Sequence, residues 1–179
     1  MRCSMLSQRV SAQPAALGWR ARPVQSRRIL SVRAMAEELV APHLARVSAA
    51  DVARVLKSAP TGTVILDVRE LTEVAEGSIK GALNVSASIV RAEDTSAFDA
   101  IVKERISGAP QVPVIVHCHF SKFRGPTCAK VLDDRLKALG MSGTEVKVLA
   151  GGVAGFMDEF KGDAALVQLP AGGWAPSHT

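Results

Sequence analysis

Two apolar runs rich in β-branched residues, each closed by polar side chains, constrain most strongly what this chain can fold into. They are TVILDVR at residues 63–69 and VPVIVHC at residues 112–118. A continuous apolar run of this length, without polar alternation, is typical of a strand buried on both faces of a parallel sheet. The two runs therefore predict the interior of an α/β fold.

Shorter strand and helix patterns alternate with these runs along the chain. The further strands are predicted at residues 45–47, 82–85 and 145–150. Helices are predicted after a Ser48 cap, at residues 95–108, from Gly125 to Gly140, and at residues 151–160. We therefore expect one α/β domain over residues 43–165, with about five mainly parallel strands flanked by helices. Residues 166–179, rich in Gly and Pro, are expected to form a flexible tail.

The first 36 residues differ in charge from the rest of the chain. They contain seven arginines and no Asp or Glu, and the first acid is Glu37. This composition is typical of a disordered organelle transit peptide, with the chloroplast as the preferred destination and the mitochondrion as the second. The alternative is a basic tail that stays attached to a protein of the cytoplasm or nucleus.

The charge balance and hydropathy also exclude some classes of partner. Subtracting the seven leader arginines from the overall +5 leaves −2 for residues 37–179, so net charge does not support a nucleic-acid partner. No apolar run approaches the roughly 20 residues that span a bilayer, so no membrane partner is expected. Of three cysteines, Cys3 lies in the leader, and Cys118 and Cys128 do not suggest a disulfide scaffold.

The segment that follows the second apolar run carries the residues best suited to chemistry. Free backbone N–H groups at the N-terminus of a helix favour both a thiolate and a bound tetrahedral oxyanion. Cys118 precedes such a helix and is the predicted nucleophile, and the planar fork of Arg124 is the predicted anion clamp. Gly125 allows close backbone approach, and Pro126 costs no hydrogen bond in the first turn. The predicted oxyanion-binding loop consists of His119, Phe120, Ser121, Lys122, Phe123, Arg124 and Gly125.

The neighbours of this loop have simpler interpretations. His117 and His119 flank Cys118, but too few further ligands are available for zinc, so no metal site is predicted. His117 is expected to be structural and His119 to be an exposed loop side chain. Cys128 is expected to pack in the core, with a role as a resolving thiol as the alternative. Ser121 either joins a loop hydroxyl network or favours a turn.

Recognisable motifs accompany this loop. HCHFSKFRGP at residues 117–126 resembles the active loop of the rhodanese-like family, in the branch that contains cell-division-cycle dual-specificity phosphatases and eukaryotic arsenate reductases. ILDVRE, EGSIKGALNV and LAGGVAGF are similar to the other signatures of that domain and occur in the same order. The resemblance covers about residues 43–165 and implies a rhodanese-like single domain.

The resemblance also implies a function. Sulfurtransferases of this family have six residues in the loop, whereas the phosphatase and arsenate reductase branch has seven, the number found from Cys118 through Arg124. The phosphatases carry acids where this chain has His119 and Phe123, which favours arsenate. The implied activity is arsenate reduction with no bound cofactor, with glutathione as co-substrate and glutaredoxin as partner. Alternatives are a protein tyrosine or dual-specificity phosphatase, a sulfurtransferase and a catalytically silent binding module.

Overall fold

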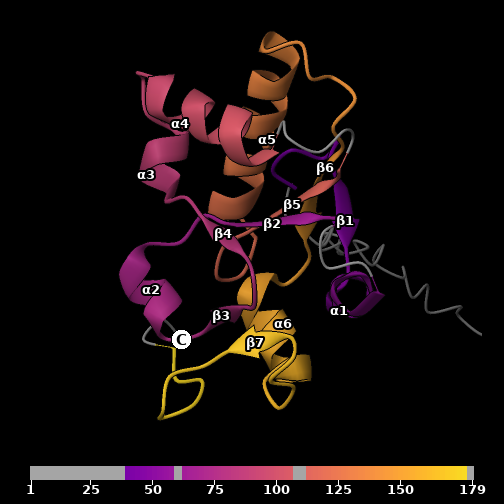
Figure 1. The fold of residues 1–179 in the computed structure, drawn as a ribbon, viewed down its shortest axis with the longest axis vertical. Coiled ribbons are helices and arrows are strands. Elements are labelled where there is room, and N and C mark those ends of the chain that lie inside the picture. Colours follow the sequence, from indigo (N-terminus) through magenta and orange to yellow (C-terminus); the bar gives the residue numbers. More distant parts are fainter. Residues whose placement is uncertain (1–38, 59–61, 107–111, 177–179) are drawn as a thin grey trace, which may run out of the picture. The chain divides into compact units, whose positions relative to one another are not determined.

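A parallel five-stranded sheet forms the centre of the computed structural model, which describes residues 39–58, 62–106 and 112–176. Its strands lie in the order β1-β6-β5-β2-β4 (Figure 1). They span Ala45–Val47 (β1), Val146–Leu149 (β6), Val114–His117 (β5), Val64–Asp67 (β2) and Leu83–Asn84 (β4). All pairs in this sheet are parallel, which confirms the prediction of a parallel α/β domain.

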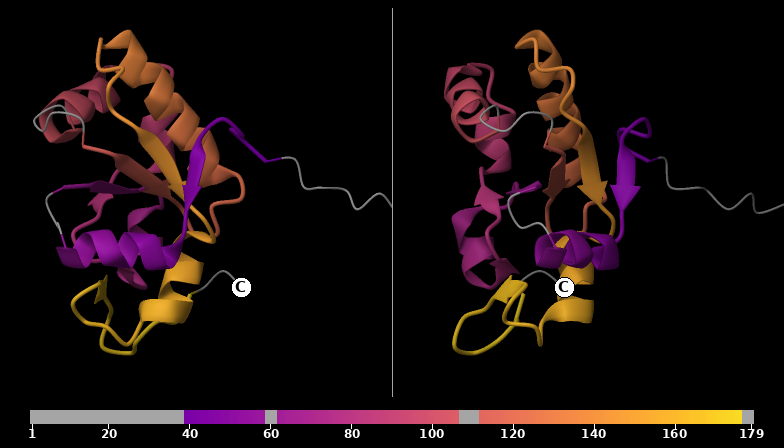
Figure 2. Two further views of the ribbon diagram at one scale, coloured as in Figure 1. Left: turned by 90° about the vertical axis from the view of Figure 1, so that its right-hand side faces the viewer. Right: turned by 45° about the vertical axis from the view of Figure 1, so that its right-hand side comes forward.

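Helices cover both faces of the sheet. Figures 1 and 2 show α3, α4 and α5 on one side of it and α1 and α6 on the other. These helices span Ala87–Val90 (α3), Ser96–Ile101 (α4), Arg124–Ala138 (α5), Ala49–Ser58 (α1) and Gly152–Phe160 (α6). Helix α4 continues into a π-helix, η1, at Val102–Ile106. The four longer helices confirm the predicted ones.

Two apolar clusters form the core because strand side chains alternate between the faces. Leu66 and Val116 are register partners and pack against α3, α4 and α5. Ile65 and Ile115, one residue earlier, pack against α1 and α6. Both faces of β2 and β5 are therefore covered, which explains why these strands are continuously apolar.

The N-terminus of α1 confirms the predicted cap. The Ser48 hydroxyl oxygen accepts the backbone N–H of Asp51 at 3.1 Å. The same hydroxyl donates to the Asp51 carboxylate at 2.6 Å. Asp51 in turn receives a hydrogen bond from Arg54 at 2.9 Å, so the first turn of α1 is held by a local polar cluster.

Sequence patterns did not predict two further elements between β2 and β4. Helix α2 spans Leu71–Ala75, and β3 spans Ser78–Ile79. Each is too short to show a periodicity. Residues 1–38 lie outside the described part of the chain, so the predicted transit peptide is not addressed by the structure. In the part that is described, no helix is both long and apolar enough to cross a membrane.

The prediction that the domain ends at residue 165 is wrong. Strand β7 at Val167–Gln168 pairs antiparallel with β3, and Leu166 and Val167 are buried in the core cluster beneath α6. Trp174 packs against the same cluster. The segment belongs to the folded domain because its few apolar side chains have partners about 90 residues earlier in the chain, which no local pattern indicates.

Candidate active site

The predicted nucleophile stands where β5 ends. Strand β5 ends at His117, whose register partner Asp67 ends β2, so the segments after both strands emerge at the same edge of the sheet. Ligands of parallel α/β sheets collect at this carboxyl edge. Cys118 is the first residue beyond it and is 5% exposed. Parallel strands thus bring the loop after β5 and helix α2 after β2 to one place.

The loop surrounds the sulfur of Cys118 with backbone donors. Its Sγ accepts the N–H of Ser121 at 3.3 Å and that of Gly125 at 3.2 Å. Gly125 lies in the first turn of α5, so the positive end of that helix is directed at the sulfur. Such donors stabilise negative charge on the atom that accepts their hydrogen bonds.

The sequence left two roles open for Ser121, a hydrogen bond within the loop and a turn, and the structure shows both. Its hydroxyl oxygen lies 3.4 Å from the backbone N–H of Cys118, which it accepts. Its φ of 53° places it in the left-handed region, which turns the chain back over the sulfur. Ser121 therefore shapes the loop and takes part in its hydrogen bonding.

Two glycines allow the backbone to close around Cys118. A Cβ atom on Gly125 would lie 3.1 Å from the backbone nitrogen of Cys118. Gly152, with a φ of 63°, lies still closer to the loop, because a Cβ there would be 2.3 Å from the carbonyl oxygen of His119. The next residues of α6 complete the contact: Val153 and Ala154 donate to the carbonyls of Cys118 and His119, each at 3.0 Å. The first turn of α6 thus supports the loop by hydrogen bonds to the backbone carbonyls of Cys118 and His119.

Arg124 is held by a carboxylate that sequence reasoning missed. Its Nη1 and Nη2 donate to Oε2 and Oε1 of Glu73 at 2.7 and 2.6 Å. The hydrogen bonds that Arg124 donates to Glu73 raise the pKa of Arg124 further above its ordinary value, and the charge of Cys118 acts in the same direction. A guanidinium has five N–H donors, so Glu73 orients the group and leaves donors for an anion.

Glu73 is itself fixed in place. It is 5% exposed, its Oε2 accepts the Glu70 N–H at 3.1 Å, and its carbonyl accepts Arg69 Nη1 at 2.9 Å. Burial acts to raise the pKa of Glu73, but the hydrogen bonds from Arg124 and Glu70 outweigh it and leave the pKa below its usual value. The carboxylate is ionised at neutral pH. No sequence signal identifies it, because its partner lies 51 residues away.

Replacing Glu73 by Gln should lower kcat/KM for an oxyanion substrate by about tenfold, because Arg124 loses the bidentate partner that orients it. Steady-state kinetics of the purified variant would measure this, with the exposed Glu93→Gln as a matched control. An increase in kcat/KM would instead mean that Glu73 competes with the anion for Arg124.

Asp67 and Arg69 form a buried ion pair at the end of β2. Arg69 Nε and Nη2 donate to the two Asp67 carboxylate oxygens at 3.0 and 2.7 Å, and both side chains are at most 1% exposed. Arg69 also donates to the carbonyl of Gly77 at 2.8 Å. The pair therefore fastens α2, and with it Glu73, to the end of β2.

His117 has the predicted structural position and is fully buried. Its Nδ1 lies 3.3 Å from the Cys118 carbonyl and 3.9 Å from Asp67. Burial lowers the pKa of His117; Asp67 acts to raise it, and Arg69 acts to lower it again. The imidazole is therefore neutral at pH 7, and in the tautomer with Nδ1–H it donates to the Cys118 carbonyl.

This lowered pKa predicts a pH dependence of stability. Below a pH of about 6.5 the unfolded chain binds a proton at His117 before the folded chain does, so the free energy of unfolding falls as the pH falls. The loss is at most about 1.4 kcal/mol per pH unit, and it is absent above that range. The free energy of unfolding, measured with denaturant between pH 5 and 8, should change less steeply with pH in His117→Asn than in the parent. The exposed His43→Asn is the control, and equal slopes in all three proteins would contradict this assignment.

The expectation that His119 is exposed is wrong. Its side chain is 5% exposed and stacks on Trp174, with ring centroids 5.9 Å apart and planes at 19°. Phe120 lies edge-on to the imidazole, with ring centroids 4.4 Å apart. Trp174, for which the sequence suggested no role, therefore braces the loop from the C-terminal segment, whereas Phe120 and Phe123 are 48% and 61% exposed.

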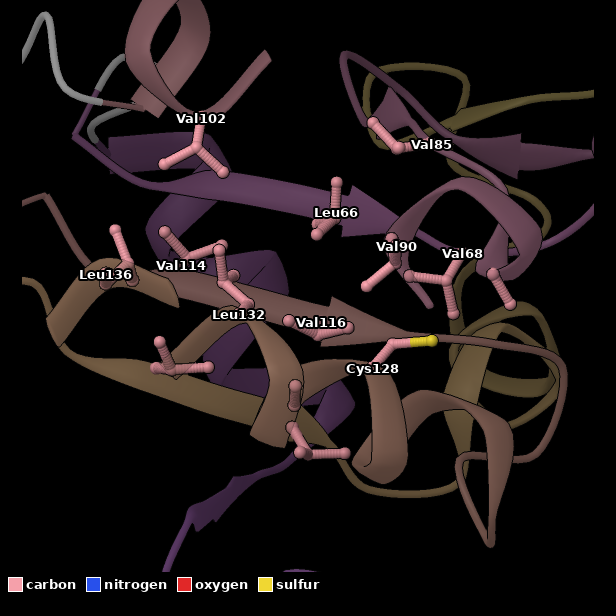
Figure 3. Close-up of a cluster of buried hydrophobic side chains, with 14 of the residues drawn as sticks. Leu66, Val68, Val85, Val90, Val102, Val114, Val116, Cys128, Leu132 and Leu136 are labelled. Atoms are coloured by element: carbon pink, nitrogen blue, oxygen red, sulfur yellow. The ribbon is translucent and has the colours of Figure 1, made fainter. Parts of the chain in front are cut away.

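Cys128 packs in the core as expected. Figure 3 shows it among Val68, Val90 and Val116, and its side chain is fully buried. Burial raises the pKa of Cys128 to about 11. A thiol in this setting is a poor nucleophile at neutral pH. In the described residues, no group of three or more His, Cys, Asp or Glu side chains is arranged to hold a metal ion.

Comparison with known protein families identifies the family to which this chain belongs. The sequence profile described as "Rhodanese-like domain" matches residues 48–159, which is more than half of the chain. The chain belongs to the rhodanese-like domain family. The match includes the loop from Cys118 to Arg124, α5 and the first turn of α6. No curated protein sequence matches the chain.

Solved structures similar to this rhodanese-like domain include a protein tyrosine phosphatase and an As-Sb reductase. Ygr203w, a yeast protein tyrosine phosphatase of the Rhodanese family, has a TM-score of 0.60 at 20% identity, over 69% of this chain and 91% of that one. An As-Sb reductase from Leishmania major has a TM-score of 0.58 at 20% identity, over 68% and 81% of the two chains. At this identity the similarity establishes the fold.

Proposed function

We propose that this rhodanese-like domain is an arsenate reductase in which the Cys118 thiolate attacks arsenate, with glutathione and glutaredoxin as reductants. The observation that carries the proposal is the loop itself. Two backbone N–H groups converge on the sulfur, and Arg124 stands at the end of the same seven-residue loop with its fork held by Glu73. This arrangement suits a tetrahedral oxyanion that receives a thiolate.

The first step needs no strong acid from the protein. Cys118 attacks arsenic, an As–S bond forms, and one arsenate oxygen leaves as water. Arg124 and the loop N–H groups neutralise the charge on the remaining oxygens. Arsenic carries no alkoxide leaving group in this reaction, so the chemistry is compatible with the residues present.

Phosphate ester hydrolysis makes a stronger demand, since an alkoxide leaving group must be protonated. The carboxyl group in contact with Arg124 is Glu73, whose lowered pKa keeps it ionised. His119 is buried against Trp174 and Phe120. Neither side chain is placed as a ready proton donor, which favours arsenate over alkyl phosphates.

The second candidate function is a protein tyrosine phosphatase. The fold shared with the yeast phosphatase and the thiolate loop both favour it. An aryl phosphate has a better leaving group than an alkyl phosphate, so tyrosine phosphate is the ester that this loop suits best. The seven-residue loop makes sulfur transfer a weaker alternative, and the presence of both Cys118 and Arg124 makes a silent binding role a weaker one.

One set of assays tests the proposal. The full chain is assayed for arsenate reduction with glutathione and glutaredoxin, for phosphate release from an aryl phosphate, and for thiocyanate formation from thiosulfate. Arsenate turnover should give the highest kcat/KM. Phosphatase activity without arsenate turnover would replace the proposal with the second candidate, and thiocyanate formation alone would replace it with sulfur transfer.

A further inference from the structure

A cavity of about 280 Å³ lies directly beside the active loop. Residues 120–123, in the middle of the loop, form one wall, and the turn at residues 150–151 before α6 forms another. Leu39 and Arg46 complete it from the start of the domain. A molecule bound there touches the same loop that surrounds Cys118, so the cavity is placed for a second reactant.

The lining of this cavity combines cations with apolar walls. Arg46 and Lys122 contribute positive charge, the rings of Phe120 and Phe123 are about half exposed or more, and none of the described residues that line the cavity is an Asp or Glu. Such a lining suits a small molecule that carries carboxylates on a partly apolar body.

Arg46 is the most informative of these residues. It is half-buried, and its Nη2 donates to the Val40 carbonyl at 2.6 Å. Its Nη1 is buried and makes no hydrogen bond within the described part of the chain, where Arg46 also has no carboxylate partner. Burial lowers the pKa of Arg46. A carboxylate bound beside it would supply the missing partner and offset the cost of desolvation.

The chemistry of the proposed function requires a second thiol. Reducing As(V) to As(III) takes two electrons, and two thiols supply them by forming one disulfide. Cys128 is fully buried with its pKa raised to about 11, so the protein core offers no reactive partner for Cys118. Within residues 39–58, 62–106 and 112–176, Cys128 is the only other cysteine, so we assign the second thiol to a molecule from solution.

We propose that the cavity formed by residues 120–123, 150–151, Leu39 and Arg46 binds the carboxylates of an anionic thiol peptide, of which glutathione is the simplest, and directs its thiol toward Cys118. This inference rests on the proposed function. The incoming thiolate attacks the Cys118 sulfur, an S–S bond forms, and the As–S bond breaks. The bonding pair passes to arsenic, which leaves as arsenite, and Cys118 remains as a mixed disulfide for a further thiol to reduce.

Binding of a non-reducing probe tests the site apart from turnover. S-methylglutathione is titrated into the full chain by calorimetry or NMR, and its dimethyl ester tests the need for carboxylates. We expect the free acid to bind at least about fivefold more tightly than the ester, and the Arg46→Gln variant to weaken it by a similar factor. Arg54→Gln, an exposed arginine on α1 paired with Asp51, is the matched control and should bind like the parent.

The outcomes separate the two proposals. No binding to the parent, or equal binding of acid and ester, overturns the thiol site even if arsenate is reduced. Because the ester comparison uses the parent protein, this conclusion holds even if Arg46→Gln does not fold. Acid-selective binding in a protein that does not turn over arsenate supports the site and overturns the arsenate reductase proposal alone.

Discussion

Replacing Cys118 by Ser should reduce arsenate turnover and aryl phosphate hydrolysis by about 10³-fold or more, because a serine hydroxyl is a much weaker nucleophile than the sulfur it replaces. The substitution removes one sulfur atom and adds no bulk, so circular dichroism and thermal unfolding should match those of the parent. Initial rates at saturating substrate measure the loss.

Cys128→Ala is the matched control for this experiment. Cys128 lies on the face of α5 that packs into the apolar cluster, so its truncation should cost about 1–2 kcal/mol of stability while activity stays within about threefold of the parent. A loss at Cys128 as large as that at Cys118 would support the alternative role of Cys128 as a resolving thiol. Retained activity in Cys118→Ser would remove Cys118 from the mechanism.

Replacing Gly152 by Ala should have the largest effect on folding. The new Cβ would lie 2.3 Å from the His119 carbonyl oxygen and 2.6 Å from that of Cys118. The backbone φ of 63° at this position is one that residues with a side chain rarely adopt. Both atoms are backbone and cannot move without shifting the loop. We expect a loss of about 3 kcal/mol or more in the free energy of unfolding, measured by urea denaturation.

The folded fraction of Gly152→Ala should also lose most of its activity, because the clash displaces the carbonyls that Val153 and Ala154 hold. Gly155→Ala, one turn later in α6, is the control. A Cβ there has only the Ala150 carbonyl oxygen nearby, at 3.8 Å, so helix propensity should stabilise the protein by about 0.5–1 kcal/mol. Equal stabilities of the two variants would contradict the proposed support of the loop by α6.

The exposed aromatic rings of the loop are explained by the cavity rather than by core packing. Phe120 and Phe123 stand beside Cys118 and remain largely open to solvent. Large exposed apolar side chains next to a nucleophile are typical of a surface that contacts a second molecule. In the proposed reaction that molecule is the thiol peptide, whereas arsenate itself meets the backbone of the loop and Arg124.

The sequence by itself determined the features that depend on neighbouring residues. Continuous apolar runs indicated buried parallel strands, and both β2 and β5 are covered on their two faces. The spacing from Cys118 to Pro126 indicated a loop that leads into a helix N-terminus, and Gly125 donates to the sulfur as this predicts. These signals are local, because strand burial and helix starts act over a few residues.

Only the tertiary structure decided which distant groups meet at the loop. Glu73 reaches Arg124 because β2 and β5 are neighbours in the sheet, so that helix α2 and the loop emerge at one edge. Trp174 reaches His119 because β7 pairs with β3 and returns the C-terminal segment to the domain. Strand order and side-chain contacts across the sheet arise from the packing of the whole chain, so local sequence patterns do not predict them.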